Sequence, residues 1–142
     1  MSDKNFQYSF ITSKNKSETF THLLDPCNWW VGVFGETIEG SSEHINDEFS
    51  FSAGDGVHYS NQKLMEIVPG QKIVWLVTES NLSFLTDTNE WAGTKICFDL
   101  SNENGKTKVT FTHQGLTPQI ECYGQCSAGW TQYLQKLEKR FA

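Results

Sequence analysis

The sequence lacks the long apolar run of a membrane span and is poor in basic residues. No stretch approaches the roughly 20 apolar residues that a transmembrane helix needs. Lys and Arg number 11 against 17 Asp and Glu, so the formal net charge is −6. Nucleic acids and anionic membrane surfaces attract clustered Lys and Arg, so neither is an expected partner. The opening MSDKNFQYSF carries no apolar signal-peptide segment, and we expect a cytoplasmic protein.

The sequence also lacks the short motifs of common active sites. GxSxG, HExxH, P-loop and dinucleotide-binding patterns are all absent. Four carboxylates lie among apolar residues, but no spacing forces two of them together for acid–base catalysis. We interpret them as solvated surface charges: Glu66, Glu79, Asp87 and Glu90. The sequence assigns no catalytic residue, and it favours a binding protein over an enzyme.

Four cysteines occur, but none forms a CxxC pair. They are Cys27, Cys97, Cys122 and Cys126. Without a secretion signal, the expected state is four reduced thiols. Cys122 and Cys126 are spaced by one helical turn and could touch, but a metal site would need two further ligands nearby. We therefore predict a buried or half-buried thiol face, with no metal and no other cofactor.

Large aromatic side chains are abundant. The chain of 142 residues has ten Phe, five Trp and four Tyr. A chain of this length buries roughly 68% of its unfolded surface, which is enough for one substantial core. No internal repeat or linker divides it, so residues 1–142 are expected to form one domain.

The final stretch, Gln119–Ala142, predicts a long amphipathic helix that needs a surface to pack against. Apolar residues recur at intervals of three and four, which places them on one stripe. The stripe consists of Cys122, Cys126, Trp130, Tyr133, Leu134, Leu137 and Phe141. Lys and Arg near its end suit the negative end of the helix dipole.

The preceding residues predict mainly short strands. Alternating apolar and polar residues, or continuous apolar runs, mark strands at residues 6–12, 48–53, 58–68, 72–78, 95–100 and 108–113. Residues 16–24 predict a helix capped by Ser13 or Ser17, and residues 28–34 a second short helix or turn. Because strands and helices do not alternate, the order predicts an α+β fold with an antiparallel sheet.

These elements resemble a known family. The segments DPCNWW, IVPGQKIVW, KVTFTHQGL and GWTQYLQKL stand in the order found in the START-like (SRPBCC) superfamily, in the group similar to the C-terminal domain of the Hsp90 ATPase activator. The resemblance covers nearly the whole chain. It implies a helix-grip fold, in which a curved antiparallel sheet wraps around the long C-terminal helix. One departure is INDEF before the Phe49 strand, where a glycine pair is common.

The resemblance also implies a cavity between sheet and helix, which the aromatic residues either fill or line. An empty apolar cavity costs about 24 cal/mol per Å³, so one of about 300 Å³ would cost roughly 7 kcal/mol. Such a space must therefore be small, wet or occupied, because whole domains are stable by only ~5–15 kcal/mol. We predict an inward, ligand-binding set of Trp30, Phe51, Tyr59, Trp75, Phe98, Phe111, His113, Tyr123, Ser127 and Trp130.

Two features of this set leave alternatives open. His113 either hydrogen-bonds a ligand or acts as a base, or it is a buried neutral histidine bonded near the helix start; the second interpretation is favoured. The stretch from Glu79 to Gly93 is long for a connection. Its Leu82, Phe84 and Leu85 form either a flap over the cavity or an outlying piece of core. Along the helix, we expect Tyr123, Ser127 and Trp130 to face the cavity.

Three functions follow as hypotheses. The first is a binding protein for a small hydrophobic ligand such as a lipid, a polyketide or an aromatic compound. The second is a cavity enzyme of the cyclase or hydrolase type. The third is a co-chaperone that stimulates a heat-shock ATPase, which ranks last because the resemblance is to one domain of the activator. We expect the aromatic residues near Trp29 and Phe34 to be exposed and to permit self-association, so the chain is expected to be a monomer or a homodimer.

Overall fold

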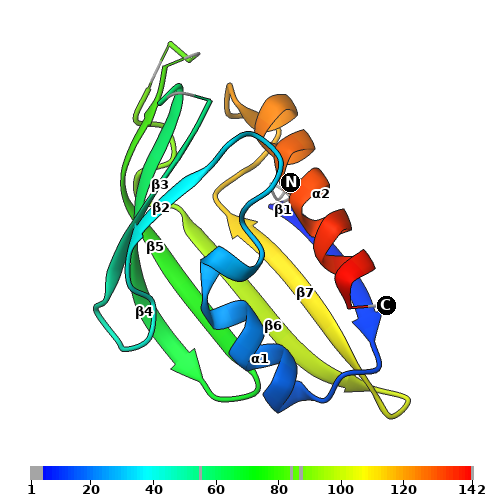
Figure 1. Ribbon diagram of the computed structural model, residues 1–142. Helices are drawn as coiled ribbons and strands as arrows, with labels where there is room; N and C mark the ends of the chain where they lie inside the picture. The colour runs from blue at the N-terminus through cyan, green and yellow to red at the C-terminus, as the bar shows by residue number, and fades with distance from the viewer. Residues whose placement is uncertain (1–4, 55, 84, 87, 142) are drawn as a thin grey trace.

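Seven antiparallel strands form one curved sheet, and the helices lie on its concave side (Figure 1). The computed structural model describes residues 5–54, 56–83, 85–86 and 88–141, so Phe84 and Asp87 lie outside the described residues. The spatial order is β1-β7-β6-β5-β4-β3-β2. The strands are β1 Phe6–Thr12, β2 Thr37–Gly40, β3 Glu48–Ala53, β4 His58–Val68, β5 Lys72–Leu82, β6 Lys95–Glu103 and β7 Lys106–Gln114. The helices are α1 Lys16–Leu24, the 3-10 helix η1 Pro26–Asn28 and α2 Tyr123–Arg140.

The helix-grip fold and the two short helices after the first strand are confirmed. In β7, Val109, Phe111 and His113 are all fully buried, while the residues between them are only half-buried. This alternation is what one buried sheet face requires. In β5, Ile73, Val74 and Trp75 are buried in succession, so this central strand is covered on both faces.

Three local features differ from the sequence-based expectations. Strand β2 has only four residues at the sheet edge, too short to give a periodic signal. Strand β5 continues past the expected end to Leu82, and a register shift between Asn61 and Gln62 accommodates its longer pairing with β4. The cap of α1 is Asn15, whose side chain accepts from the Glu18 amide at 2.7 Å, rather than Ser13 or Ser17. Asparagine is an equally good cap, so composition alone did not discriminate.

The INDEF departure has a simple conformational explanation. Asn46 adopts φ 77°, in the left-handed region that glycine usually occupies. Asparagine tolerates this region better than other non-glycine residues. The neighbouring Asp47 carboxylate accepts the amides of Glu43 and His44, which closes the turn. The turn is therefore preserved without a glycine pair.

The second half of helix α2 is fastened to the rest of the chain by side-chain hydrogen bonds. Lys136 Nζ donates to the Gly32 carbonyl at 2.7 Å, and Arg140 Nη1 to the Asn28 carbonyl at 2.6 Å. Tyr8 donates to the Glu138 carboxylate at 2.6 Å. The buried residues of the helix, including Leu134, belong to the hydrophobic core, and the helix packs against β1. In the described part of the chain, no helix is both long and apolar enough to cross a membrane.

Leu134 should contribute strongly to stability because its side chain is fully buried. We expect Leu134→Ala to lower the free energy of unfolding by about 2–5 kcal/mol through lost burial and the cavity left behind. Chemical denaturation measures this loss. The matched control is Ile11→Ala, since Ile11 is 52% exposed and its truncation should cost about 1 kcal/mol or less. Equal losses for the two variants would contradict the assignment of Leu134 to the core.

Candidate functional site

A pocket of about 330 Å³ lies between the first half of α2 and the sheet, beside the connection from β3 to β4. Its walls combine fully buried rings with exposed residues, so it opens to solvent on one side. Phe34 and Val57 are 48% and 45% exposed and mark the mouth. The lining consists of Trp30, Phe34, Phe51, Ala53, Gly54, Val57, His58, Trp91, Gln125, Cys126, Gly129, Trp130 and Tyr133.

Stacked aromatic rings make up the pocket wall. Trp30 stacks on Phe51 with ring centroids 4.0 Å apart, and Trp130 lies 4.8 Å from Trp30. Trp91 is nearly parallel to Trp130, at 5.8 Å and 11°. Each of these rings is about 2% exposed. The wall is therefore aromatic and apolar, with most of each ring covered by its neighbours, and it favours apolar partners.

The neighbouring Trp29 fills the rest of the space between sheet and helix. Its ring stacks on Trp30 at 5.7 Å and meets Phe98 edge-on at 4.9 Å. The indole N–H donates to the Leu23 carbonyl at 2.8 Å, which fixes the ring beside α1. The two adjacent tryptophans thus have different roles. Trp29 fills the inner half of the space between sheet and helix, and Trp30 lines the half that is open to solvent. The expectation that Trp29 is exposed is wrong, because the residue is 3% exposed.

His113 joins helix, sheet and loop through both ring nitrogens. Nδ1 accepts from the Trp130 indole N–H at 3.0 Å, and Nε2 lies 2.8 Å from Thr94 Oγ1. An indole nitrogen can only donate, so Nδ1 must be unprotonated and the proton resides on Nε2. Nε2 then donates to Thr94 Oγ1, which in turn donates to the Trp91 carbonyl at 2.6 Å. Every donor in this chain has an acceptor, which is the buried neutral arrangement.

Burial keeps both pocket-side histidines neutral. Desolvation, with a smaller contribution from His58, lowers the pKa of His113 to about 3. Desolvation likewise lowers the pKa of His58 to about 4. Protonating His113 would turn Nδ1 into a donor facing the Trp130 N–H. The geometry therefore disfavours His113 as a general base, because both of its nitrogens are already engaged.

The connection between β5 and β6 is held against the start of α2 rather than hanging free. Leu82 and Leu85 are buried, and Trp91 forms part of the pocket wall. The Glu90 carboxylate accepts the backbone amides of Glu121 and Cys122 at 3.0 and 3.2 Å. Amides at a helix start favour a negative partner. Among the alternatives for this stretch, the geometry supports the outlying piece of core.

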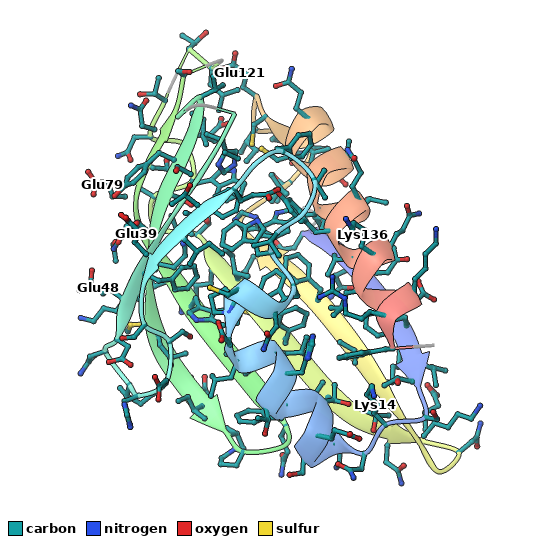
Figure 2. All side chains as sticks on the ribbon, viewed as in Figure 1. Lys14, Glu39, Glu48, Glu79, Glu121 and Lys136 are labelled. Atoms are coloured by element: carbon teal, nitrogen blue, oxygen red, sulfur yellow. The ribbon has the colours of Figure 1, made fainter. Side chains whose placement is uncertain are left out.

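Glu90 is consequently not the solvated charge that the sequence suggested, whereas Glu66 and Glu79 are exposed. Figure 2 shows Glu79, Glu39 and Glu48 on the outer edge, away from α2, and Glu121 near the first turn of α2. Glu121 accepts from the Thr86 amide at 3.0 Å, so a second carboxylate ties the same loop to the helix.

Hydrogen bonds to the Glu36 carboxylate fix the outer rim of the pocket. Glu36 accepts the amides of Gly32 and Phe34, each at 2.7 Å, and the Tyr133 hydroxyl at 2.5 Å. Burial by itself would raise the pKa of Glu36, but these hydrogen bonds together outweigh it and hold that pKa below its ordinary value. Burial, followed by the contact with Glu36, raises the pKa of Tyr133. The segment carrying Phe34 is thereby anchored to α2.

Three of the ten sequence-predicted residues line the pocket, namely Trp30, Phe51 and Trp130. Four more face inward but lie deeper, in the packed core: Trp75, Phe98, Phe111 and His113. Trp75 is held there by its indole N–H, which donates to Ser42 Oγ at 2.9 Å. Its burial therefore reflects core packing beneath the pocket.

The remaining three residues do not face the pocket. Tyr59 is paired with Ser52, and it alternates with His58 and Ser60, so its side chain lies on the outer face of the sheet. Tyr123 and Ser127 are half-buried outside the pocket lining. The helix advances about 100° per residue, which puts Ser127 on one flank of Trp130 and Cys126, Gly129 and Tyr133 on the other. The pocket lies on that second flank.

Sequence reasoning missed the residues that come from connections. Phe34 ends an apolar stretch just before Gly35, Val57 is a single apolar residue beside Gly56, and Trp91 follows a run of polar residues. Their only signal is a large or branched apolar side chain in a polar setting. Cys126 and Tyr133 did belong to the predicted helical stripe, and only their side of it was misjudged. In the part of the chain that the structure describes, no group of three His, Cys, Asp or Glu could hold a metal ion.

The neutral state of His113 predicts a specific pH dependence of stability. Its pKa of about 3 in the folded protein lies below the ordinary 6.5, so between these values the unfolded chain takes up a proton that the folded chain refuses. Its contribution is therefore complete above pH 6.5 and is lost as the pH falls, by up to about 1.4 kcal/mol per pH unit. His113→Gln should cost about 1–3 kcal/mol at pH 7.5, because one amide does not reproduce the positions of both ring nitrogens, and either the Trp130 N–H or the Thr94 hydroxyl loses its partner.

Urea unfolding at pH 7.5 and pH 5 checks this pattern. The difference between the protein and His113→Gln should shrink at pH 5, because only the histidine chain loses stability there through this site. The matched control is His44→Gln at an exposed position, which should change the free energy of unfolding by about 0.5 kcal/mol or less at pH 7.5. A stability difference that stays constant between the two pH values would contradict the buried neutral histidine.

Comparison with known proteins adds a family assignment. The sequence profile of the family described as "Activator of Hsp90 ATPase homolog 1-like protein" matches residues 10–142. A sequence search of curated proteins finds no match.

Among solved structures, the chain is similar to the Aha1 dimer from Colwellia psychrerythraea, with a TM-score of 0.73, 18% identity, and coverage of 97% of this chain and 96% of that chain. It is similar to protein MLL2253 from Mesorhizobium loti, with a TM-score of 0.72, 18% identity, and coverage of 96% and 95%. A more distant likeness is DynU16, a putative protein in the dynemicin biosynthetic locus, with a TM-score of 0.64, 13% identity, and coverage of 97% and 47%. The match over residues 10–142, on a curved sheet gripping a C-terminal helix, shows that the chain belongs to the Activator of Hsp90 ATPase homolog 1-like family of the START-like (SRPBCC) superfamily.

Proposed function

We propose that the protein binds a small, apolar and largely planar ligand in the pocket beneath α2. The observation that carries this proposal is the pocket wall of Trp30, Phe51, Trp91 and Trp130, which remains open at Phe34 and Val57. A volume of about 330 Å³ stands at the low end for ligand sites. This favours an aromatic compound, a small polyketide or a short acyl chain over a long-chain lipid.

Few polar groups would orient such a ligand. The Trp91 and Trp130 N–H groups point to Cys122 and His113, and the Tyr133 hydroxyl points to Glu36. Affinity would therefore come mainly from apolar burial, about 25 cal/mol per Å² removed from water. Gln125 lines the pocket from an exposed position and is the amide best placed to meet a polar group at the mouth.

The cavity-enzyme hypothesis is weakened by the same geometry. His113 is the only histidine from the predicted site, and its two nitrogens bind Trp130 and Thr94. Stimulation of a heat-shock ATPase is kept as a second candidate, because the matching family carries that description. ATP turnover by the chaperone, with and without this protein, tests it, and an unchanged rate would dispose of it. A homodimer also stays a proposal, since the Colwellia neighbour is described as a dimer.

Ligand binding is tested by native mass spectrometry of protein purified without denaturation, together with a thermal-shift screen of aromatic compounds and short acyl lipids. A ligand at 100 times its Kd should stabilise the folded protein by about 2.7 kcal/mol. Absence of both a bound mass and any thermal shift across the panel would reject the proposal.

A matched pair of helix variants locates the site. Gly129 lines the pocket, and an added Cβ would meet only Phe34, at 3.9 Å, so Gly129→Leu should fill the space without a clash. Gly124 has open surroundings and lies outside the lining, so Gly124→Leu is the control. Both changes should raise helix propensity by about 0.8 kcal/mol. Only Gly129→Leu should abolish the ligand-induced shift, and equal shifts in both variants would place the ligand elsewhere.

A further inference from the structure

Two thiols meet in the wall of the pocket at the start of α2. Cys122 is the residue before the helix, and its carbonyl accepts the Cys126 amide at 2.7 Å. The Trp91 indole N–H donates to Cys122 Sγ at 3.2 Å. Cys122 is fully buried, whereas Cys126 is 7% exposed and lines the pocket. The route from solvent to the thiol pair therefore runs through the apolar pocket.

The contact between the two thiols moves their pKa values in opposite directions. The Cys126 thiol donates to Cys122 and lowers the pKa of Cys122; burial opposes this effect, and the Trp91 N–H assists it. The same contact raises the pKa of Cys126, because its ionisation would place two negative sulfurs together. The Glu90 carboxylate, which accepts the Cys122 amide, acts against ionisation of either sulfur. Cys122 is therefore the thiol of the pair that ionises more readily, and Cys126 is the one that stays protonated beside it.

We propose that Cys122 and Cys126 form an oxidisable dithiol site that reacts with a hydroperoxide entering through the apolar pocket and closes to a disulfide. The Cys122 sulfur attacks an oxygen of the hydroperoxide, the O–O bond breaks, and the departing alkoxide takes the proton that Cys122 released. Cys122 is then a sulfenic acid. Cys126 attacks its sulfur, the S–S bond forms, and water leaves with the Cys126 proton. Two thiols are oxidised, and the hydroperoxide is reduced to an alcohol and water.

The helix start permits this bridge. Residues four apart in a helix advance by about 1.5 Å each, so their Cα atoms are about 6 Å apart, within the range of disulfides. The side chains must draw closer to form the bridge, and Cys122 can adjust because it is the cap residue, outside the regular turns of the helix. Oxidation would convert the Cys122 sulfur that accepts the Trp91 N–H into a disulfide sulfur. The redox state of the pair is thereby coupled to the position of one pocket wall.

Peptide mapping of the full chain tests the proposal directly. The protein is treated with cumene hydroperoxide under native conditions, then denatured, alkylated and digested with trypsin. Cys122 and Cys126 share the tryptic peptide of residues 109–136, while Cys27 and Cys97 fall in the peptides of residues 17–63 and 96–106 and serve as internal controls. After oxidation, the peptide of residues 109–136 should carry no alkyl group and should be two hydrogens lighter than the unmodified dithiol peptide. Reductant should reverse this change. The change should appear before the exposed Cys27 reacts.

Two further comparisons identify the preferred oxidant and the route by which it reaches the thiols. Hydrogen peroxide at the same concentration should oxidise the pair several-fold more slowly than cumene hydroperoxide, and Gly129→Leu should slow the apolar reagent. Cys122→Ser should abolish the reversible loss of two hydrogens. Two alkyl groups retained on the peptide of residues 109–136 when Cys27 is already oxidised would overturn the proposal. A faster reaction with hydrogen peroxide would overturn entry through the pocket. Oxidation of the pair in a protein that fails the ligand screen would leave this inference standing and reject only the ligand-binding proposal.

Discussion

The hydrogen bond from the Trp130 indole to His113 Nδ1 is the interaction on which the arrangement of this protein depends. It joins the middle of α2 to β7 at 3.0 Å, in a position where neither group reaches water. Because the indole can only donate, it dictates the tautomer of His113, and the tautomer dictates the bond to Thr94. Through Thr94, the bond also fixes the Trp91 carbonyl. Helix, sheet and loop therefore adopt positions that are consistent only with a neutral imidazole.

The same network explains why the space under the helix is only partly filled. A curved sheet leaves more volume on its concave side than one helix can occupy. Trp29 fills the part beside α1, where its ring meets Phe98 and its N–H reaches the Leu23 carbonyl. On the other side, Trp91 and Trp130 are held by hydrogen bonds to Cys122 and His113 and do not collapse inward. The open half of the space thus has rigid aromatic walls.

Sequence patterns predicted the fold well, because the fold depends on periodicity. The alternation of Val109, Phe111 and His113, and the stripe of α2, follow directly from one buried face. The pocket was only partly predictable. Whether Trp29 or Trp30 lines the pocket depends on how η1 turns the chain. The sequence does not distinguish two adjacent tryptophans in this respect. Tyr133 and Ser127 lie on opposite flanks of Trp130 around the helix. Which flank faces the pocket is set by tertiary packing, which the helical spacing does not reveal.

The fastening of α2 is asymmetric along its length, and this has a consequence for its motion. Its second half is tied to three separate segments through Lys136, Glu138 and Arg140, whereas Gly124 and Gly129 both fall in its first half. Glycine gains more backbone freedom than other residues when a turn opens. Local opening should therefore start at residues 122–129 and propagate toward the carboxyl end, so that backbone amides in these first turns exchange with deuterium earlier than those after Tyr133. Opening of these turns would separate the pocket face of α2 from the connection that Glu90 and Glu121 hold against it.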